Sequence, residues 1–269
     1  MMGGHHAISG TAGWMALAGT AAISSTSMGL DSFGPLGSTI PLGAGVLGDL
    51  GTAEVLAGAV VATGAALLPD IDHPSATIAQ TGGAVTKRIT KTVSSAAGHR
   101  GATHTPLLAI VFMVLASLAA AADIRFHMPV IGDVQIGAAF IVMAMTAFGV
   151  RALKVVRGNI APWLTGILAA LVVAVAAPDN AIWLPLAVGI GAVIHLVGDM
   201  LTTDGIPFPL WPLVLKPKKG HDSALWHKNG NIALPILGNA GSKREWTLCL
   251  FLTVYVLVAI VATLVLATL

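Results

Sequence analysis

Histidines and aspartates, which bind divalent metals through nitrogen and oxygen, recur in four short segments of the sequence. These segments are HHAISG (5–10), LLPDIDHP (67–74), GHRGATHT (98–105) and HLVGD (195–199), and they hold six of the nine histidines. Imidazole and carboxylate ligands without a cysteine suit Zn²⁺, Mn²⁺ or Fe better than Mg²⁺. The sequence therefore predicts a metal site, provided that the fold brings the four segments together.

The spacing within two of these segments supports that prediction. His195 and Asp199 are four residues apart, so in a helix the carboxylate can share an ion with the imidazole or orient it. Pro69 disfavours a helical residue before it, so a helix should end just before Asp70 and Asp72. We expect one or two divalent ions, with zinc as the first expectation and Mn or Fe as alternatives, held by His6, Asp72, His73, His99, His104, His195 and Asp199.

The composition of the chain is that of an integral membrane protein. Of its 269 residues 55% are hydrophobic and 10% are charged, whereas soluble proteins carry roughly 25% charged residues. The formal net charge of +2 is too small to favour nucleic acid as a partner, and we expect none. The single cysteine, Cys249, excludes an intrachain disulfide, and the first residues lack the features of a cleaved signal peptide.

Seven apolar stretches are long enough to cross a bilayer, which needs about 17–25 residues. We expect one all-α membrane domain over 1–269, with spans at 7–29, 52–68, 105–122, 134–150, 160–177, 181–201 and 246–268. The first stretch is rich in Gly, Ser and Thr and so suits a helix packed against other helices. Ser242 and Glu245 have the spacing of a capping box before the last helix, and we interpret both as capping residues.

The basic residues orient these helices. With a cytoplasmic N-terminus, thirteen of the fourteen Lys and Arg residues fall on the cytoplasmic side, chiefly in loops 69–104 and 202–245, and only Arg125 lies outside. All four histidine- or aspartate-bearing segments then lie at the cytoplasmic ends of helices. Ionisable residues within a span usually face the interior of the bundle. We therefore expect the four segments to form one site at the cytoplasmic face.

Each pattern also has an interpretation without a metal. An HxxxD pair often arises by chance, Asp70 and Asp72 can cap the next segment, and Arg100 can be a positive anchor at the membrane surface. We interpret His5 as a spacer beside His6. Three histidines are expected outside the site, namely His127 on the external side and His221 and His227 in a loop. The coincidence of four segments at one membrane depth is what favours the metal.

The motifs LLPDIDHP, GHRGATHT and HLVGDMLTTDGIPFPLWP, in this order, resemble those of the YdjM-type family of bacterial inner-membrane proteins, classed as metal-dependent hydrolases. HHAISG matches the family's early histidine, with His6 as the matching residue, and LPILGNAGSKRE resembles its element before the last helix. Residues 123–180 carry no motif that we can match. The resemblance implies a hydrolase of the bacterial cytoplasmic membrane with a metal bound by the residues of these motifs.

HLVGD is also similar, more distantly, to the His-x-x-Gly-Asp helix of zinc-dependent phospholipase C and S1/P1-type nucleases. Those are α-helical enzymes that cleave phosphoesters at clustered zinc ions. The similarity puts His195 and Asp199 on ligand positions. Because no downstream His-x-x-x-Glu helix completes a three-zinc cluster, one or two ions are expected.

These observations predict hydrolysis of a phosphoester by a metal-activated water. Asp70 or Asp72 is expected to act as a ligand or as the general base, and Arg100 to bind and neutralise the phosphate oxygens. Thr103 and Thr105 are expected to contact the substrate, support the ligands or cap the next helix. Since the site lies at the predicted cytoplasmic interface, the expected substrate is a membrane lipid or lipid-linked phosphate.

Two other functions fit the same residues. A metal-ion transporter would place ionisable residues along the whole membrane depth, whereas here they cluster at one face. A non-catalytic scaffold would hold a structural metal in a closed four-ligand site, whereas a catalytic metal keeps one position open.

Overall fold

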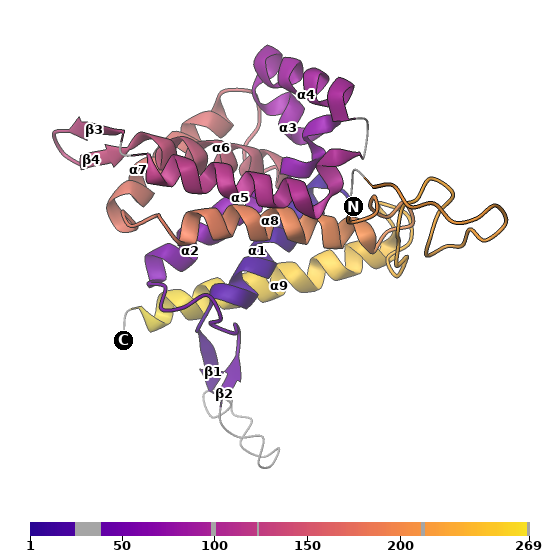
Figure 1. Cartoon of the computed structure of the whole chain (residues 1–269). Helices are drawn as coiled ribbons and strands as arrows, with labels where there is room; N and C mark the ends of the chain where they lie inside the picture. Colours follow the sequence, from indigo (N-terminus) through magenta and orange to yellow (C-terminus); the bar gives the residue numbers. More distant parts are fainter. Residues whose placement is uncertain (25–38, 98–100, 123, 211–212, 268–269) are drawn as a thin grey trace.

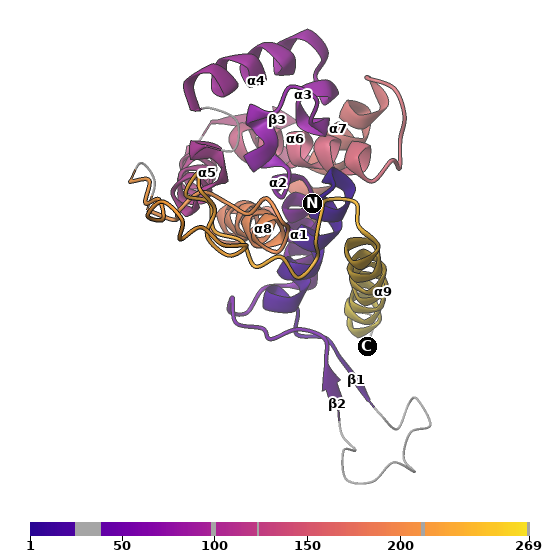
Figure 2. The ribbon, with the colours of Figure 1, turned by 90° about the vertical axis from the view of Figure 1, so that its right-hand side faces the viewer.

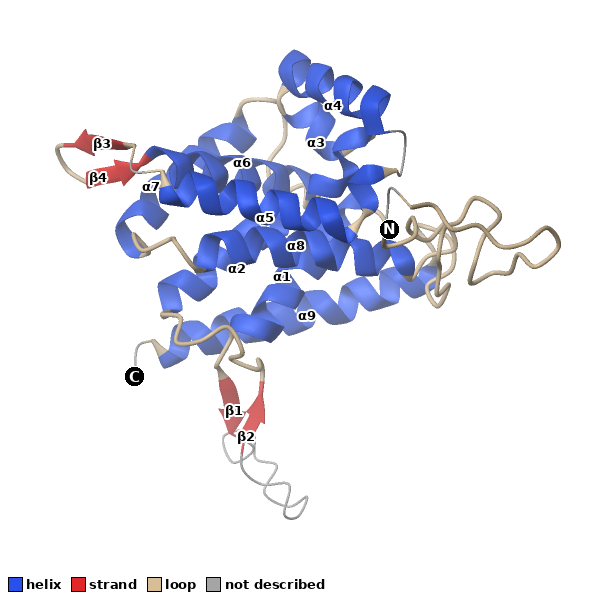
Figure 3. Cartoon of the chain, viewed as in Figure 1, coloured by secondary structure: helices blue, strands red, loops and turns tan. Residues whose placement is uncertain are grey.

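The computed structural model of the chain describes residues 1–24, 39–97, 101–122, 124–210 and 213–267. Within these residues the protein is mostly helical, as the sequence predicts (Figure 1, Figure 3). An apolar helix overlaps each predicted span. These helices are α1 (Gly3–Ala18), α2 (Thr52–Ala65), α5 (Pro106–Ala121), α6 (Ile136–Ala152), α7 (Ala161–Ala176), α8 (Trp183–Met200) and α9 (Lys243–Leu266).

The apolar helices differ in length. Among the described residues, three segments are long and apolar enough to cross a membrane, namely Thr52–Asp72, Trp183–Met200 and Lys243–Leu266. The first of these joins α2 to the short 3-10 helix η3 (Leu68–Asp72). Helices α5, α6 and α7 are apolar but only 16 or 17 residues long. The fold is that of a helical membrane protein, and seven crossings with a cytoplasmic N-terminus stay a prediction.

The first predicted span, 7–29, extends well past the end of the helix that the structure has there. Helix α1 begins at Gly3 and ends at Ala18, and strand β1 (Ala22–Ser24) follows, paired antiparallel with β2 (Thr39–Pro41). The helix stops because Gly19 adopts an extended conformation, and the next residues, TAAIS, include Thr, Ile and Ser, which are poorer helix formers than Ala. Residues 25–29 of the prediction lie outside the described residues.

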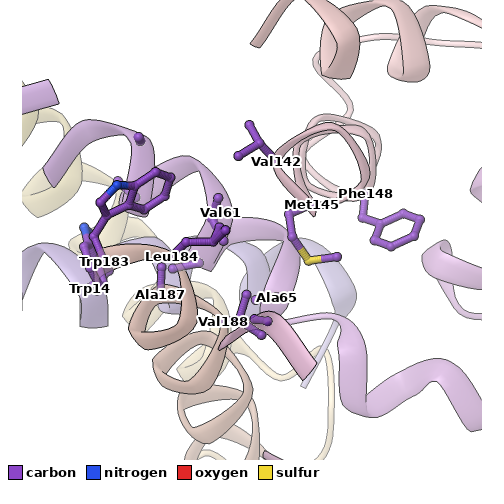
Figure 4. Close-up of a cluster of buried hydrophobic side chains, with 14 of the residues drawn as sticks. Trp14, Val61, Ala65, Val142, Met145, Phe148, Trp183, Leu184, Ala187 and Val188 are labelled. Carbon is purple, nitrogen blue, oxygen red and sulfur yellow. The ribbon is translucent and has the colours of Figure 1, made fainter. Parts of the chain in front are cut away.

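Helix α2 packs against α1, α6 and α8, and this packing forms the core of the bundle (Figure 2). Close approach needs small residues, because a Cβ added to Gly64 would lie 1.9 Å from the carbonyl oxygen of Met145 on α6. Figure 4 shows the apolar side chains of this core, which include Trp14 and Leu184. The indole N–H of Trp14 donates to the carbonyl of Val55 at 2.7 Å, so its buried polar atom is paired.

The two ends of the bundle carry different connections. The short helices α3 (Thr77–Thr81), α4 (Gly83–Ala97) and η4 (Ala102–His104) lie in the predicted cytoplasmic loop 69–104. The hairpin of β3 (Arg125–Met128) and β4 (Gly132–Gln135) lies at the end of the bundle opposite the N-terminus (Figure 1). The start of α1 and the end of α8 lie at the same end as the N-terminus, and η3 and η4 join them there.

Candidate metal centre

Five of the polar side chains singled out in the sequence meet at this end of the bundle. His6 comes from the first turn of α1, Asp70 from η3, His104 from η4, and His195 and Asp199 from the last two turns of α8. Each lies in a group of three residues whose nitrogen or oxygen atoms are within 4.8 Å of one another. One group is Asp70, His104 and His195, and the other is His6, His195 and Asp199.

The two imidazoles of His104 and His195 form the middle of this cluster. Their Nε2 atoms lie 3.4 Å apart. Asp70 Oδ1 lies 3.6 Å from Nε2 of His104 and 3.8 Å from Nε2 of His195. Asp199 Oδ2 lies 3.5 Å and 3.6 Å from the same two nitrogens. Four ligand atoms therefore form two triangles that share the edge between the imidazoles.

These separations are close to those of atoms that share one metal ion. Two ligands bound tetrahedrally to Zn²⁺ at bond lengths of 2.0–2.2 Å lie about 3.3–3.6 Å apart. The distance between the two imidazole nitrogens and the four distances from a carboxylate oxygen to an imidazole nitrogen all lie between 3.4 and 3.8 Å. A donor set of imidazole nitrogens and carboxylate oxygens also suits Zn²⁺, Mn²⁺ or Fe. The residues present therefore fit a divalent ion.

The second oxygen of Asp199 faces the other side of the cluster. Asp199 Oδ1 lies 3.1 Å from Nε2 of His6 and accepts a hydrogen bond of 2.5 Å from the amino group of Met1. The rings of His6 and His195 stack with centroids 3.7 Å apart. Nδ1 of His6 is buried and has no hydrogen-bond partner among the described residues. One oxygen of Asp199 can therefore bind an ion beside His104 and His195, and the other oxygen can bind a second ion beside His6.

Hydrogen bonds on the far side of each ring orient the two central imidazoles. Nδ1 of His195 lies 2.7 Å from the carbonyl of Ala66 and must donate to it, so Nε2 is left as the lone-pair atom. The hydroxyl of Thr103 donates to Asp72 Oδ2 at 2.6 Å and lies 3.1 Å from Nδ1 of His104. Nδ1 of His104 then donates to the hydroxyl, and Nε2 again faces the cluster.

Asp72 therefore has a different position from the one predicted. It is fully buried and accepts the hydrogen bond of Thr103, and neither group of ligand atoms includes it. Because η3 has three residues per turn, Asp70 and Asp72 leave it in directions that differ by about 120°. Asp70 reaches the ligand atoms, and Asp72 lies behind His104. In the structure Asp72 makes an orienting contact, and its predicted role as a ligand or base stays a prediction.

The other predicted site residues are distributed as follows. His73 is half-buried, its Nδ1 accepts a hydrogen bond from the backbone N–H of Ser75 at 3.2 Å, and it is in neither ligand group. Thr105 is the N-cap residue of α5, as predicted, but its hydroxyl donates to the carbonyl of Ala102 at 2.7 Å and makes no capping hydrogen bond. His99 and Arg100 lie outside the described residues, so their predicted ligand and phosphate-binding roles stay predictions.

Sequence reasoning missed a second buried pair, which involves His5 and Glu245. His5 is 4% exposed and its Nδ1 lies 2.5 Å from Oε1 of Glu245, so interpreting His5 as a spacer is wrong. Glu245 also accepts from the backbone N–H groups of Met2 and Gly241, both at 2.8 Å. Ser242 caps α9 as predicted, but the carboxylate of Glu245 binds the start of α1 instead of completing a capping box. The sequence did carry one indication of this pair, because Glu245 is a charged residue in the first turn of a long apolar helix.

The hydroxyl of Thr103 offers a test of how His104 is oriented. We expect Thr103→Val to weaken metal binding about tenfold, because the substitution removes the partner of His104 Nδ1 without changing the volume. Titration of the metal-free protein with Zn²⁺ measures this. Thr105→Val is the matched control, since Thr105 is equally buried but bonds only a backbone carbonyl in the described structure. Equal affinities of the two variants would contradict the assigned role.

A buried cluster of three histidines and two aspartates at one end of an apolar helical bundle defines a class, namely helical membrane proteins with a candidate metal centre. Residues 1–266 of this chain match the family model described as YdjM inner membrane protein. The chain belongs to this family and is an inner-membrane protein. Neither a curated protein nor a solved structure matches the chain. The more distant similarity to phospholipase C therefore stays a prediction.

Proposed function

We propose that this protein is a membrane-bound metal-dependent hydrolase that cleaves a phosphoester of a lipid or lipid-linked substrate at the cytoplasmic interface. The observation that carries the proposal is the pair of ligand triangles around His104 and His195, with separations of 3.4–3.8 Å. His104, His195 and Asp199 would hold one divalent ion, with His6 as a ligand of a second ion. Asp70 would complete the ligand set or act as the general base. A bound divalent ion lowers the pKa of its water from 15.7 to about 7 and so supplies hydroxide at cytoplasmic pH.

The exposure of Asp70 supports a catalytic site over a structural one. The other four side chains of the cluster are at most 2% exposed, whereas Asp70 is 27% exposed. A structural metal is normally enclosed by four protein ligands, and a catalytic site keeps one position open. Asp70 lies at the accessible side, 3.6 Å from His104 and 3.8 Å from His195. There its carboxylate can take the proton of the attacking water.

The remaining residues of the site have supporting roles in this proposal. Ala66 and Thr103 hold the imidazoles of His195 and His104 in the tautomers that keep Nε2 toward the reacting groups. Arg100 would bind the non-bridging phosphate oxygens through its planar guanidinium. The transporter alternative gains no support, because the five clustered residues come from the start of α1, the end of α8 and the neighbouring η3 and η4, which lie at one end of the bundle.

The proposal predicts hydrolysis that depends on metal. We expect purified protein to cleave at least one member of a panel of phospholipids and prenyl phosphates, and a chelator to abolish the activity. Added Zn²⁺, Mn²⁺ or Fe²⁺ should restore it. Release of phosphate or of the headgroup measures the reaction, with Asp199→Ala as the inactive control. The absence of chelator-sensitive turnover across the panel would favour a non-catalytic scaffold.

A further inference from the structure

Helix α4 is amphipathic and lies at the edge of the bundle (Figure 1). Val85 and Ile89 are four residues apart and share one face, and they are 67% and 48% exposed. A different face is basic and exposed, because the spacing of three and four residues brings together Lys87, Arg88 and Lys91. A helix with one apolar and one basic face is typical of the interface between a membrane and water.

The start of α4 is held in place by its neighbours. Gly83 has a φ of +61°, which lets the chain turn sharply between α3 and α4. The hydroxyl of Thr86 donates to the carbonyl of Ala79 in α3 at 2.7 Å. The indole N–H of Trp163, near the start of α7, donates to the carbonyl of Thr81 at 2.9 Å. The direction of α4 is therefore set by the fold.

The helix lies across the bundle. In Figure 2, α8 and α9 are seen nearly end-on, whereas α4 is seen from its side. Both α8 and α9 are long and apolar enough to cross a membrane. Helix α4 also packs against η3, at the end of the bundle that holds the candidate metal centre. A helix that lies across the spanning helices at their end runs along the surface of the membrane, here the predicted cytoplasmic surface.

A cavity on the apolar side of α4 continues toward the bilayer. It has a volume of about 600 Å³, and mainly apolar residues of α4, α6 and α7 line it. Val85 and Ile89 line it from α4, and Phe140 and Phe148 line it from α6. The two phenylalanines are eight residues apart, which corresponds to about 12 Å along α6. Apolar cavities of this kind do not bind water well, whereas the acyl chains of lipids suit them.

The charges of α4 and of the loop beside it are all positive. Lys154 and Arg157, in the loop between α6 and α7, are exposed like the basic residues of α4. Neither 73–122 nor 134–178 contains an Asp or Glu residue. Within the described part of the chain, no basic residue of α4 forms an ion pair. This surface is complementary to the phosphates of anionic lipids, because each Lys or Arg near an anionic membrane strengthens binding about fivefold.

We infer that α4 lies in the headgroup region of the membrane and binds anionic phospholipids. Its apolar face contacts the acyl chains, and Lys87, Arg88 and Lys91 bind the phosphates. The inference does not depend on the proposed hydrolysis, since none of these residues belongs to the metal cluster. A protein partner could cover the same apolar face, but the unbroken positive charge and the apolar cavity beside α6 favour the lipid.

Lipid binding to the purified protein tests the basic face. The full-length protein in detergent is titrated with anionic phosphatidylglycerol or with zwitterionic phosphatidylcholine, and bound lipids are counted by native mass spectrometry. We expect phosphatidylglycerol to bind at least about tenfold more tightly than phosphatidylcholine. The combined variant Lys87→Gln, Arg88→Gln and Lys91→Gln should lose this preference and bind phosphatidylcholine as the wild type does.

The control removes three charges elsewhere. Lys216→Gln, Lys218→Gln and Lys219→Gln change the net charge equally, and all three lysines are exposed in the loop before α9. This variant should keep the wild-type preference. Equal losses of the preference in the two variants, or no preference in the wild type, would overturn the inference.

Fluorescence quenching tests the apolar face. A label on Ile89→Cys, in full-length protein that carries Cys249→Ala, is measured in vesicles that contain phosphatidylglycerol. Lipids with a quencher near the headgroup should quench this label, and iodide in the water should not. A label on Ala84→Cys, which is exposed and shares the face of the basic residues, should show the reverse. Quenching of both labels by iodide alone would overturn the inference and favour a protein partner.

Discussion

Purified protein that carries His195→Ala or Asp199→Ala is expected to lose its bound metal. Nε2 of His195 belongs to both ligand groups, and the two oxygens of Asp199 face the two sides of the cluster. Removal of either residue therefore takes a ligand atom from the position beside His104 and from the position beside His6. Loss of an outer-shell contact costs about 10–100-fold in metal affinity, so loss of either ligand should cost more than that. Elemental analysis of the purified variants should therefore find metal only at background level.

An exposed histidine provides the matched control for that experiment. His127 on β3 also pairs with a carboxylate, Asp133 Oδ1, at 2.7 Å, but its side chain is 74% exposed and at the opposite end of the bundle. We expect His127→Ala to keep the wild-type metal content. Full retention of metal by both His195→Ala and Asp199→Ala would contradict the assigned centre.

Glu245→Ala is expected to destabilise the protein by about 3 kcal/mol, the cost of removing one partner of a buried pair. The substitution leaves His5 and the N–H groups of Met2 and Gly241 without the carboxylate that now binds all three. At 2–4 °C per kcal/mol for a chain of this size, the midpoint of thermal unfolding in detergent should fall by roughly 6–12 °C.

The other glutamate of the chain is the control for this prediction. Glu54 also accepts a backbone N–H near a helix start, from Gly51 at 2.7 Å, but this bond is exposed and local. We expect Glu54→Ala to lower the midpoint by no more than about 3 °C, as loss of a capping contact does. A Glu245→Ala midpoint no lower than that of Glu54→Ala would show that the pair with His5 does not anchor α1 to α9.

Much of the site could be predicted because its signals are local. The spacing of His195 and Asp199 places both on one helical face, and the structure has both in α8. The distribution of basic residues placed four distant segments at one membrane depth, and in the structure η3, η4, the start of α1 and the end of α8 do meet. Hydropathy alone located the seven apolar helices, although α1, α5, α6 and α7 are only 16 or 17 residues long.

The rest depends on geometry that the sequence does not carry. Whether Asp70 or Asp72 faces the ligands is decided by the 3-10 turn of η3, in which residues two apart point in different directions. The pair of His5 and Glu245 joins residues 240 positions apart, and no periodicity relates them. The end of α1 at Ala18 lies within a stretch that is apolar enough to continue, so hydropathy placed it too far along the chain.

The metal content of the wild-type protein tests the central claim most directly. The protein is purified in detergent without added metal or chelator, and transition metals are measured per chain by elemental analysis. The ligand triangles around His104 and His195 predict one divalent ion per chain, and the position beside His6 allows a second. A content of one to two ions of zinc, manganese or iron per chain is the predicted result. Protein that is folded and free of metal, and that binds none when Zn²⁺ is added, would contradict the account.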